Sequence, residues 1–505
     1  MDSLPLYKRL AAHYLDAIRA GQLARGERMP SLRGLMRQHS VSLSTAIQVC
    51  RELEAGGWLE ARDRSGYFVR APARAGIAPL KEPANSGVAP DPAQYVGIHA
   101  RVSAFVSNRR NQAVKVNFSI ARAAPQLYPG EALRAAVHKG LRQRPELLTV
   151  APQQRGDAGF RSVLARRALA SGMTLAPDDI LVTNGCIEAL NLALRAVAQA
   201  GDTIAVESPT FYGLLQVLES LGLRALEIPT SPQTGISLEA LQLAADTYGD
   251  IKAVVVVPHL QNPLGSVMPD ANKQGLLRLC EERGIALIED DTYSALIDSG
   301  TPLRAIKSWD AHGQVIHCAS LHKILAPGMR LGWMAAGRWQ ARVEMLKYAQ
   351  TRNNESLSQV GAGQFMATGA YDRHLRRLRG ALATQRERTA EAIAHYFPSG
   401  TRMNLPPGGL QLWVELPARL SANLLCEAAL AEHILIAPGS LFSNSGRFDH
   451  FARLNCGWPY TAEIDAALRR LGELATSLIK AQQVARPRAG APEAPVKTSA
   501  ASALP

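Results

Sequence analysis

The sequence predicts a multidomain protein in which a small, mainly helical module precedes a large α/β domain. The chain has 505 residues, more than one compact domain usually contains. Residues 1–72 are dense in charge and contain short helical patterns, whereas short apolar runs alternate with helical patterns from about Val116 onward. Hydrophobic residues make up 47% of the chain and charged residues 20%, which is typical of a globular protein rather than a disordered or fibrous one.

The first 72 residues predict three helices followed by a hairpin. An amphipathic helix begins near Leu6, Ser31 can cap a second helix, and Ser42 can cap a third over 43–55. Strand-like runs on both sides of Arg62-Asp63-Arg64 predict the hairpin. This order is the plan of a winged helix-turn-helix, whose third helix enters the major groove of DNA. The module holds 11 basic and seven acidic residues, so composition alone leaves a small solvated helical module equally open.

Composition changes twice more along the chain. Residues 73–115 are rich in Pro, Ala and Gly and predict a linker, so the large α/β domain spans 116–482. Residues 483–505 have low complexity and predict a disordered tail. The six cysteines include no Cys-x-x-Cys pair, and no apolar run approaches the length of a membrane span. We therefore expect a reduced, cytoplasmic protein without disulfides, a structural zinc site or a membrane segment.

The large domain has the rhythm of a parallel sheet covered by helices. Helical patterns separate most of its short, almost entirely apolar runs, which predicts strands buried on both faces. The expected strands are 180–183, 203–206, 225–228, 253–257, 286–289, 315–318 and 331–334, and the expected helices include 186–199, 212–221, 237–247 and 271–283. Because an open α/β sheet binds ligands beyond the carboxyl ends of its strands, functional residues are expected at these ends.

Four polar motifs follow predicted strands. They are Thr183–Cys186, Gln261–Gly265, Glu289–Tyr293 and Ala319–Arg330. Each alone is explained by a turn, a helix cap or a surface charge. Together they supply what pyridoxal 5′-phosphate requires: an amine for a Schiff base, a carboxylate for the pyridine nitrogen, and an arginine with a helix end for the phosphate. We therefore expect this cofactor and no metal.

The N-terminal motifs resemble the GntR family of bacterial DNA-binding domains. The resemblance covers residues 4–70 and rests on Gly21-x-Leu-x-x-Gly-Glu-x-Met-Pro-Ser-x-Arg33, Val41-Ser-x-Ser-Thr45 and Gly66-Tyr-Phe-Val69. It implies a double-stranded DNA operator as partner, contacted by Arg33, Ser42, Ser44, Thr45, Arg64 and Gly66. Leu43 stands where members of that family usually carry an arginine, which removes one base or phosphate contact.

Residues 116–480 resemble a fold-type I aminotransferase domain, and the tandem arrangement resembles the MocR subgroup of GntR regulators. The resemblance implies that Lys323 is the Schiff-base lysine and that Asp290 pairs with the pyridine nitrogen. Arg453, in Phe451-Ala-Arg-Leu-Asn455, is implied to bind an amino-acid carboxylate. The other implied cofactor contacts are Asn262 and Tyr293 with the ring hydroxyl, Phe211 with the ring face, and Gly185, Cys186, Ser320 and Arg330 with the phosphate.

The sequence departs from that family around the site. Gln154 and Arg155 occupy the neighbourhood of a tyrosine that reaches the phosphate of the partner subunit in the family. His322 precedes the lysine where serine is common, Cys186-Ile187 replaces a small residue and Gln, and 118–129 lacks the customary glycine. These departures leave the Schiff-base lysine intact, so they favour cofactor binding over catalytic turnover.

Three functions are compatible with these motifs. The leading hypothesis is a homodimeric DNA-binding transcriptional regulator whose large domain binds pyridoxal phosphate and senses it, or an amine or amino-acid effector that exchanges with Lys323. The alternative is an active aminotransferase with an accessory DNA-binding module. A third reading, in which the large domain only dimerises, is disfavoured because the lysine and its partners are present.

Overall fold

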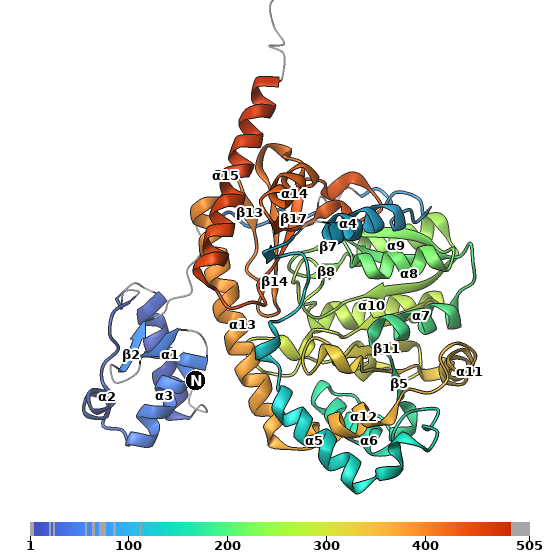
Figure 1. Ribbon diagram of the computed structural model, residues 1–505, viewed down its shortest axis with the longest axis horizontal. Helices are drawn as coiled ribbons and strands as arrows, with labels where there is room; N and C mark the ends of the chain where they lie inside the picture. Colours follow the sequence, from blue (N-terminus) through green and yellow to red (C-terminus); the bar gives the residue numbers. More distant parts are fainter. Residues whose placement is uncertain are drawn as a thin grey trace, which may run out of the picture.

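The computed structural model describes residues 5–19, 22–23, 26–55, 58–62, 66–69, 77–83, 87–111 and 113–485. It contains a small N-terminal module, a large sheet domain and a C-terminal α+β part (Figure 1). In the described residues, no helix combines the length and apolar character needed to cross a membrane.

The N-terminal module has the elements expected from the sequence. Three helices surround a core of their own, which includes Tyr14, Leu35, Val49 and Leu53. The hairpin pairs its strands antiparallel. The elements are α1 (Leu6–Arg19), α2 (Leu32–His39), α3 (Leu43–Ala55), β1 (Leu59–Arg62) and β2 (Gly66–Val69). The winged helix-turn-helix plan is therefore present in the described part of the module.

Part of the segment expected to be a linker is ordered against the large domain. It contains β3 (Gln94–Tyr95) and α4 (His99–Asn111), and Ile98 and Val102 are buried in the main core. The amides of Ile98 and His99 donate to Glu219 Oε2 at 2.6 and 2.8 Å. That carboxylate lies far away in sequence and satisfies free amides at the start of α4, which local patterns do not reveal. The domain boundaries themselves stay predictions.

The large domain contains a sheet with the strand order β3-β7-β6-β9-β10-β11-β12-β5, and β8 pairs with β7. Adjacent strands from β7 through β11 run parallel, as predicted. The prediction is wrong for β12, which is antiparallel to β11 and β5, because residues 321–331 contain no helix that could cross back. The bounds are β5 (Leu181–Thr183), β6 (Thr203–Ser208), β7 (Arg224–Ser231), β8 (Gly235–Ile236), β9 (Ile251–Val256), β10 (Ala286–Asp290), β11 (Val315–Ser320) and β12 (Gly332–Ala335).

Helices cover both faces of this sheet, as expected. One face of the sheet packs mainly on α7 and α8. The opposite face packs on two groups of helices, α9 with α10, and α6 with α12 and α13. These helices are α5 (Gly130–Gln143), α6 (Ala158–Ala168), α7 (Cys186–Val197), α8 (Tyr212–Ser220), α9 (Leu238–Tyr248), α10 (Asp270–Arg283), α11 (Gln340–Gln350), α12 (Ser356–Met366) and α13 (Gly369–Tyr396).

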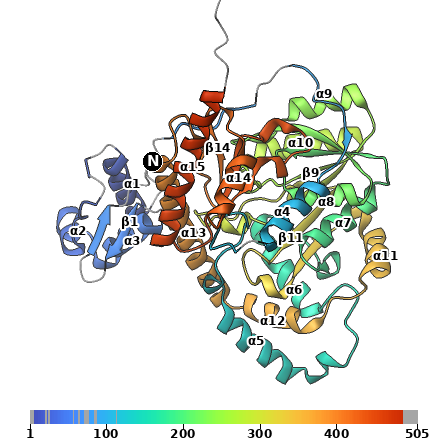
Figure 2. The same cartoon turned by 45° about the horizontal axis from the view of Figure 1, so that its top comes forward.

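The C-terminal part is a small antiparallel sheet packed on α13, α14 and α15 (Figure 2). Its strand β17 carries Arg453 toward the large domain. The elements are β13 (Arg402–Met403), β14 (Gln411–Glu415), α14 (Ala422–Ala431), β15 (Ile434–Leu435), β16 (Ala437–Pro438), β17 (Phe451–Asn455) and α15 (Ala462–Ala485), and β15 pairs with β4 (Val116–Asn117). Helix α15 extends past residue 483, where a tail is expected, and residues 486–505 lie outside the described residues.

Candidate functional sites

The polar motifs meet at one edge of the large sheet. Strands β6, β9, β10 and β11 are parallel, and β5 shares their direction because both β5 and β11 are antiparallel to β12. The residues that follow these strands therefore lie at the same edge, where parallel α/β sheets place their ligands. The structure thus places Gly185, Asp290 and Lys323 near one another: Asp290 and Arg330 both act electrostatically on Lys323, and Gly185 lies beside Arg330.

Lys323 lies in the loop between β11 and β12. Its Nζ donates to the carbonyl of Ala121, and the same nitrogen is 6.0 Å from the ring centroid of Tyr293. Burial lowers the pKa of Lys323 to about 7, and the nearby cations Arg453 and Arg122 act in the same direction. An amine with this pKa is substantially unprotonated near neutral pH, which is the nucleophilic form.

Asp290, at the end of β10, is held through one of its two oxygens. Oδ1 accepts hydrogen bonds from Cys186 Sγ at 3.1 Å, Thr292 N at 3.1 Å and Thr292 Oγ1 at 2.5 Å. Oδ2 has no hydrogen-bond partner in the described chain, so it is available to a ligand. Burial raises the pKa of Asp290, while the donors on Oδ1 oppose this shift. The thiol of Cys186 is therefore a hydrogen-bond donor to the carboxylate of Asp290, a role that the sequence did not indicate.

An anion-binding corner lies at the N-terminus of α7. Gly185 precedes this helix with φ +80°, a conformation that favours glycine. Arg330 Nη2 donates to the carbonyl of Asn184 at 3.2 Å, and a Cβ on Gly185 would lie 3.5 Å from that nitrogen. Ser320 is buried, and its Oγ accepts from the amide of His322 at 3.1 Å. A helix N-terminus beside an arginine and a hydroxyl suits a phosphate.

His322 is a neutral base in this corner. Its Nδ1 lies 3.4 Å from Arg330 Nη1, an interaction in which the arginine donates. Burial and the charges of Lys323 and Arg330 lower the pKa of His322 to about 4. The imidazole therefore adds no positive charge beside the lysine at neutral pH. Of these two side chains, only Lys323 changes its charge near pH 7.

Arg453 is almost fully buried and is not paired with a carboxylate among the described residues. Nη1 donates to Asn262 Oδ1 at 3.0 Å, Nη2 donates to the carbonyl of Ser119 at 2.5 Å, and the guanidinium lies 4.9 Å from the ring centroid of Phe442. Its Nε has no hydrogen-bond partner in the part of the chain that the structure describes. A buried arginine with an unused donor is suited to bind a carboxylate from a ligand.

Aromatic residues border the same site. Tyr293 is buried, and its burial raises the pKa of the phenol. Phe211 precedes α8, and its ring centroid is 5.0 Å from that of Tyr212. Tyr212 was not singled out from the sequence as a separate site residue, yet it interacts electrostatically with the buried guanidinium of Arg453. The contacts of Phe211, Tyr293 and Asn262 with a cofactor ring stay predictions.

The region where the family carries a phosphate-contacting tyrosine is tied to α11 instead. Arg155 Nε lies 2.9 Å from Glu344 Oε1, and Gln154 Nε2 donates to the carbonyl of Glu344 at 3.4 Å. These side chains are engaged within the same chain.

The N-terminal module places hydroxyl groups at the start of α3. Ser42 Oγ accepts from Thr45 N at 3.2 Å and lies 2.8 Å from Ser44 Oγ. Leu43 is 49% exposed at the first position of this helix, where it cannot replace an arginine contact. A helix N-terminus with exposed hydroxyls is suited to a DNA phosphate.

The other expected DNA contacts lie on α2 and at the hairpin. Arg33 is exposed on α2, and Gly66 begins β2 with φ +95°. A Cβ on Gly66 would lie 3.6 Å from Arg28 Nε, so exposed Arg28 adds a positive charge at the wing that the sequence did not single out. Arg64 lies outside the described residues.

Comparisons with known proteins define the class of both parts. Residues 126–471 match the family described as aminotransferase class I and II, and residues 6–69 match bacterial regulatory proteins of the gntR family. The HTH-type transcriptional regulators YdcR and YjiR of Escherichia coli K12 are each 35% identical to this chain. The alignments cover 93% and 92% of the chain and 98% of each relative.

A solved aminotransferase has the same fold as the large domain. The α-aminoadipate aminotransferase LysN of Thermus thermophilus, in complex with N-(5′-phosphopyridoxyl)-L-leucine, aligns with a TM-score of 0.69 and 26% identity. The alignment covers 76% of this chain and 96% of that one. The protein is thus a GntR-type helix-turn-helix module joined to a fold-type I aminotransferase domain. The chain belongs to the MocR subgroup of GntR-family transcriptional regulators.

Proposed function

We propose that this protein is a DNA-binding transcriptional regulator whose large domain binds pyridoxal 5′-phosphate through Lys323 and senses that cofactor or an amine or amino-acid effector. The observation that carries the proposal is the joint placement of an amine of lowered pKa, a carboxylate with one free oxygen and an anion-binding corner. A domain that only dimerised would not require this combination.

The donors and acceptors of the site fit the cofactor. When bound, pyridoxal phosphate supplies an aldehyde that reacts with amines and a ring that withdraws electrons. Asp290 Oδ2 is the free acceptor for a protonated ring nitrogen. Gly185, Ser320 and Arg330 form the corner for the phosphate, with the first amides of α7. Arg453 has a buried donor left for the carboxylate of an effector.

Effector binding can reach the DNA-binding module only if it changes the relative stability of two arrangements of the protein. Arg453 lies on β17 of the C-terminal part, whereas Lys323 lies in the large domain, so a ligand that contacts both joins the two parts. We propose that the active form is a homodimer, which would present two DNA-binding modules to paired operator half-sites. Binding to chromosomal DNA requires the cytoplasmic location expected from the sequence.

Absorbance spectroscopy tests the cofactor proposal. Purified protein mixed with pyridoxal phosphate should show an absorption band distinct from that of the free cofactor, and Lys323→Ala should abolish it. Lys252→Ala is a matched control, because Lys252 is half-buried and paired with Asp250 away from this site. A band that persists in Lys323→Ala would refute the assignment of the lysine.

A gel-shift titration tests the DNA proposal. The probe is the DNA upstream of the protein's own gene, measured with and without cofactor and with a panel of amines and amino acids. Arg33→Ala should weaken binding at least fivefold, since loss of a charged contact to DNA costs about 1–3 kcal/mol. Unchanged binding by Arg33→Ala would show that α2 and α3 do not form the DNA interface, and light scattering would report the dimer.

The unprotonated lysine also favours a second candidate function, an active aminotransferase. Arg453 and Lys323 are both present, and the pKa of the lysine is about 7. Repeated conversion of an amino acid to its keto acid, with an amino acceptor in excess, is the test. Multiple turnovers without an effect on DNA binding would favour the enzyme, whereas ligand-dependent DNA binding without turnover favours the regulator.

A further inference from the structure

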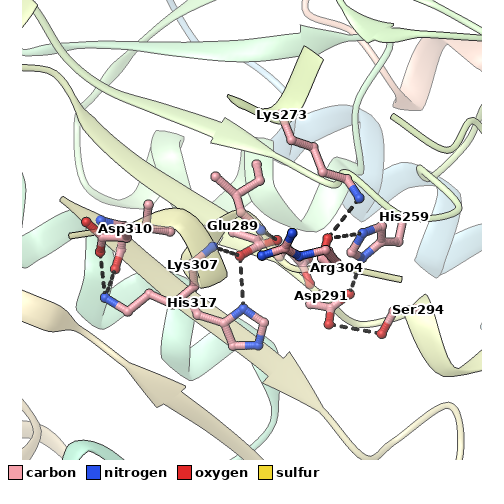
Figure 3. A network of polar contacts seen from close by, with 12 residues as sticks. His259, Lys273, Glu289, Asp291, Ser294, Arg304, Lys307, Asp310 and His317 are labelled. Carbon is pink, nitrogen blue, oxygen red and sulfur yellow. Dashed lines mark hydrogen bonds and ion pairs between the residues drawn. The ribbon is translucent and has the colours of Figure 1, made fainter. Parts of the chain in front are cut away.

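The reverse face of strands β10 and β11 carries a second set of buried polar groups. Successive side chains of a strand point to opposite faces, so Glu289 and Asp291 face away from Asp290. Glu289 lies opposite His317 on the neighbouring strand. Figure 3 shows these residues with His259 and Lys307 in a network of hydrogen bonds and ion pairs. None of this network is used by the proposed cofactor site.

His317 is the incomplete member of this network. Its Nδ1 lies 3.1 Å from Glu289 Oε2, and the backbone amides of Ile306 and Lys307 also donate to that carboxylate. Its side chain is only 1% exposed, and its buried Nε2 has no hydrogen-bond partner among the described residues. Burial lowers the pKa of His317, but the carboxylates of Glu289 and Asp291 outweigh it and raise the pKa overall. Buried polar atoms rarely stay unpaired without a ligand or water.

His317 lines a cavity of about 1110 Å³. This volume is slightly larger than the range of about 300–1,000 Å³ that is usual for small-molecule sites. Its inner wall is mainly apolar and aromatic, and Trp333 lies 4.9 Å from the His317 ring, centroid to centroid. The residues that line the cavity include Ser320 and Thr292 but neither Lys323 nor Arg453. The cavity therefore adjoins the proposed cofactor site and is separate from it.

Charged groups without complete partners line the outer part of the same cavity. Arg376 is exposed and Arg379 is half-buried, and neither forms an ion pair with a carboxylate in the described residues. Arg379 Nε donates only to the carbonyl of Ala295, at 2.8 Å. Asp298 pairs with Arg386 through Oδ2, and its buried Oδ1 has no hydrogen-bond partner within the described ranges. Unpaired cations beside an unused carboxylate oxygen match a ligand that carries both an acid and an amine.

We propose that this cavity is a second ligand site, specific for a free amino acid with a hydroxylated aromatic side chain. The carboxylate of the amino acid is bound by Arg376 and Arg379, and its amine donates to Asp298 Oδ1. The ring packs along the apolar wall toward Trp333, and its hydroxyl pairs with His317 Nε2. A hydroxyl serves either protonation state of the imidazole, because it both donates and accepts.

The position of the cavity gives the site a regulatory consequence. Glu54, Leu59 and Ala61 of the N-terminal module border it, and Figures 1 and 2 both show that module beside α13. Ser320, which also lines the cavity, belongs to the anion-binding corner of the proposed cofactor site. A ligand here therefore contacts the DNA-binding module and the back of the cofactor site together.

Calorimetric titration of the full chain, before and after addition of pyridoxal phosphate, tests the proposal. The probes are L-tyrosine, tyramine, which lacks the carboxylate, and 3-(4-hydroxyphenyl)propionate, which lacks the amine. We expect saturable binding of tyrosine under both conditions. Each analogue should bind at least tenfold more weakly, because one charged hydrogen-bonded group is worth about 1.5–3 kcal/mol and 1.4 kcal/mol is tenfold.

Variants assign this binding to the cavity. Arg376→Gln should weaken tyrosine binding about two- to fivefold, because an exposed ion pair contributes up to about 1 kcal/mol. Arg377→Gln, which changes an exposed arginine next to it that does not line the cavity, should leave binding unchanged. His317→Leu, which cannot hydrogen-bond a hydroxyl, should abolish the preference for L-tyrosine over L-phenylalanine when both are titrated. Because Arg376 is exposed, its variant is expected to fold even if His317→Leu does not. No saturable binding, equal binding by Arg376→Gln, or loss of binding in Arg453→Gln would each overturn the proposal.

Discussion

Replacement of Cys186 by alanine tests how the cofactor site holds its carboxylate. The thiol is one of three donors to Asp290 Oδ1, at 3.1 Å, and both side chains are buried. Hydrogen bonds to charged groups contribute about 1.5–3 kcal/mol, and a thiol is a weak donor, so we take about 1 kcal/mol for this bond. Without it, the pKa of Asp290 rises further, and less carboxylate is available to a protonated ring nitrogen.

The expected result is a roughly fivefold increase in the Kd for pyridoxal phosphate, since 1.4 kcal/mol corresponds to tenfold. Equilibrium dialysis at neutral pH measures this change directly. Cys186→Ser keeps a donor of similar size and should bind the cofactor about as well as the unmodified protein. Cys318→Ala is the matched control, because it removes another buried thiol near Asp290 that makes no hydrogen bond in the described residues.

The reasoning would be refuted in either of two ways. If Cys186→Ala and Cys318→Ala bind the cofactor equally well, the thiol contributes only packing. If Cys186→Ser is as weak as Cys186→Ala, donation to Asp290 is not what the thiol provides. Urea unfolding of all three variants separates these outcomes from a general loss of stability, which is expected to be about 1 kcal/mol for each removal of a buried sulfur.

The remaining predictions concern the lysine, the strand beside it and the N-terminal module. Because the pKa of Lys323 is about 7, its reaction rate with pyridoxal phosphate should rise with pH through a midpoint near 7, and a midpoint above about 9 would contradict this. Gly332→Ala should lower the free energy of unfolding by about 2 kcal/mol in a denaturant titration, because its Cβ would lie 2.7 Å from backbone atoms. Gly328→Ala, whose Cβ would have no neighbour within 4 Å, should have little effect. Ser42→Ala removes the bond to Thr45 N and should destabilise the module by about 1 kcal/mol, measured by helical circular dichroism on heating.

The arrangement of the cofactor site was largely predictable from the sequence. Short apolar runs separated by helical patterns predict parallel strands, and the polar motifs that follow β5, β9, β10 and β11 then fall at one edge. Asp290 and Lys323 could be placed together in this way because the geometry of a parallel sheet is general. The helices of the N-terminal module were predictable for a similar reason, since caps such as Ser31 and Ser42 act within one turn.

Other features depend on contacts between residues far apart in the chain. The antiparallel direction of β12 follows from the missing crossover helix, and α4 depends on the distant carboxylate of Glu219. The sequence cannot show that Asp290 Oδ2 and Arg453 Nε lack hydrogen-bond partners in the described chain, because this depends on which distant residues contact the other atoms of these side chains. The orphaned Nε2 of His317 likewise has no signature in the sequence.

The sequence by itself determined the order of elements and the two domain types, and it predicted candidate site residues, because helix caps, hydrophobic periodicity and strand ends are local properties. Only the tertiary structure decided which atoms remain free. Cys186 and Asp290 are 104 residues apart, and Arg453 meets Asn262 across 191 residues. Hydrogen-bond satisfaction is a property of the packed chain, so both the free atoms of the cofactor site and the second cavity behind it are consequences of packing.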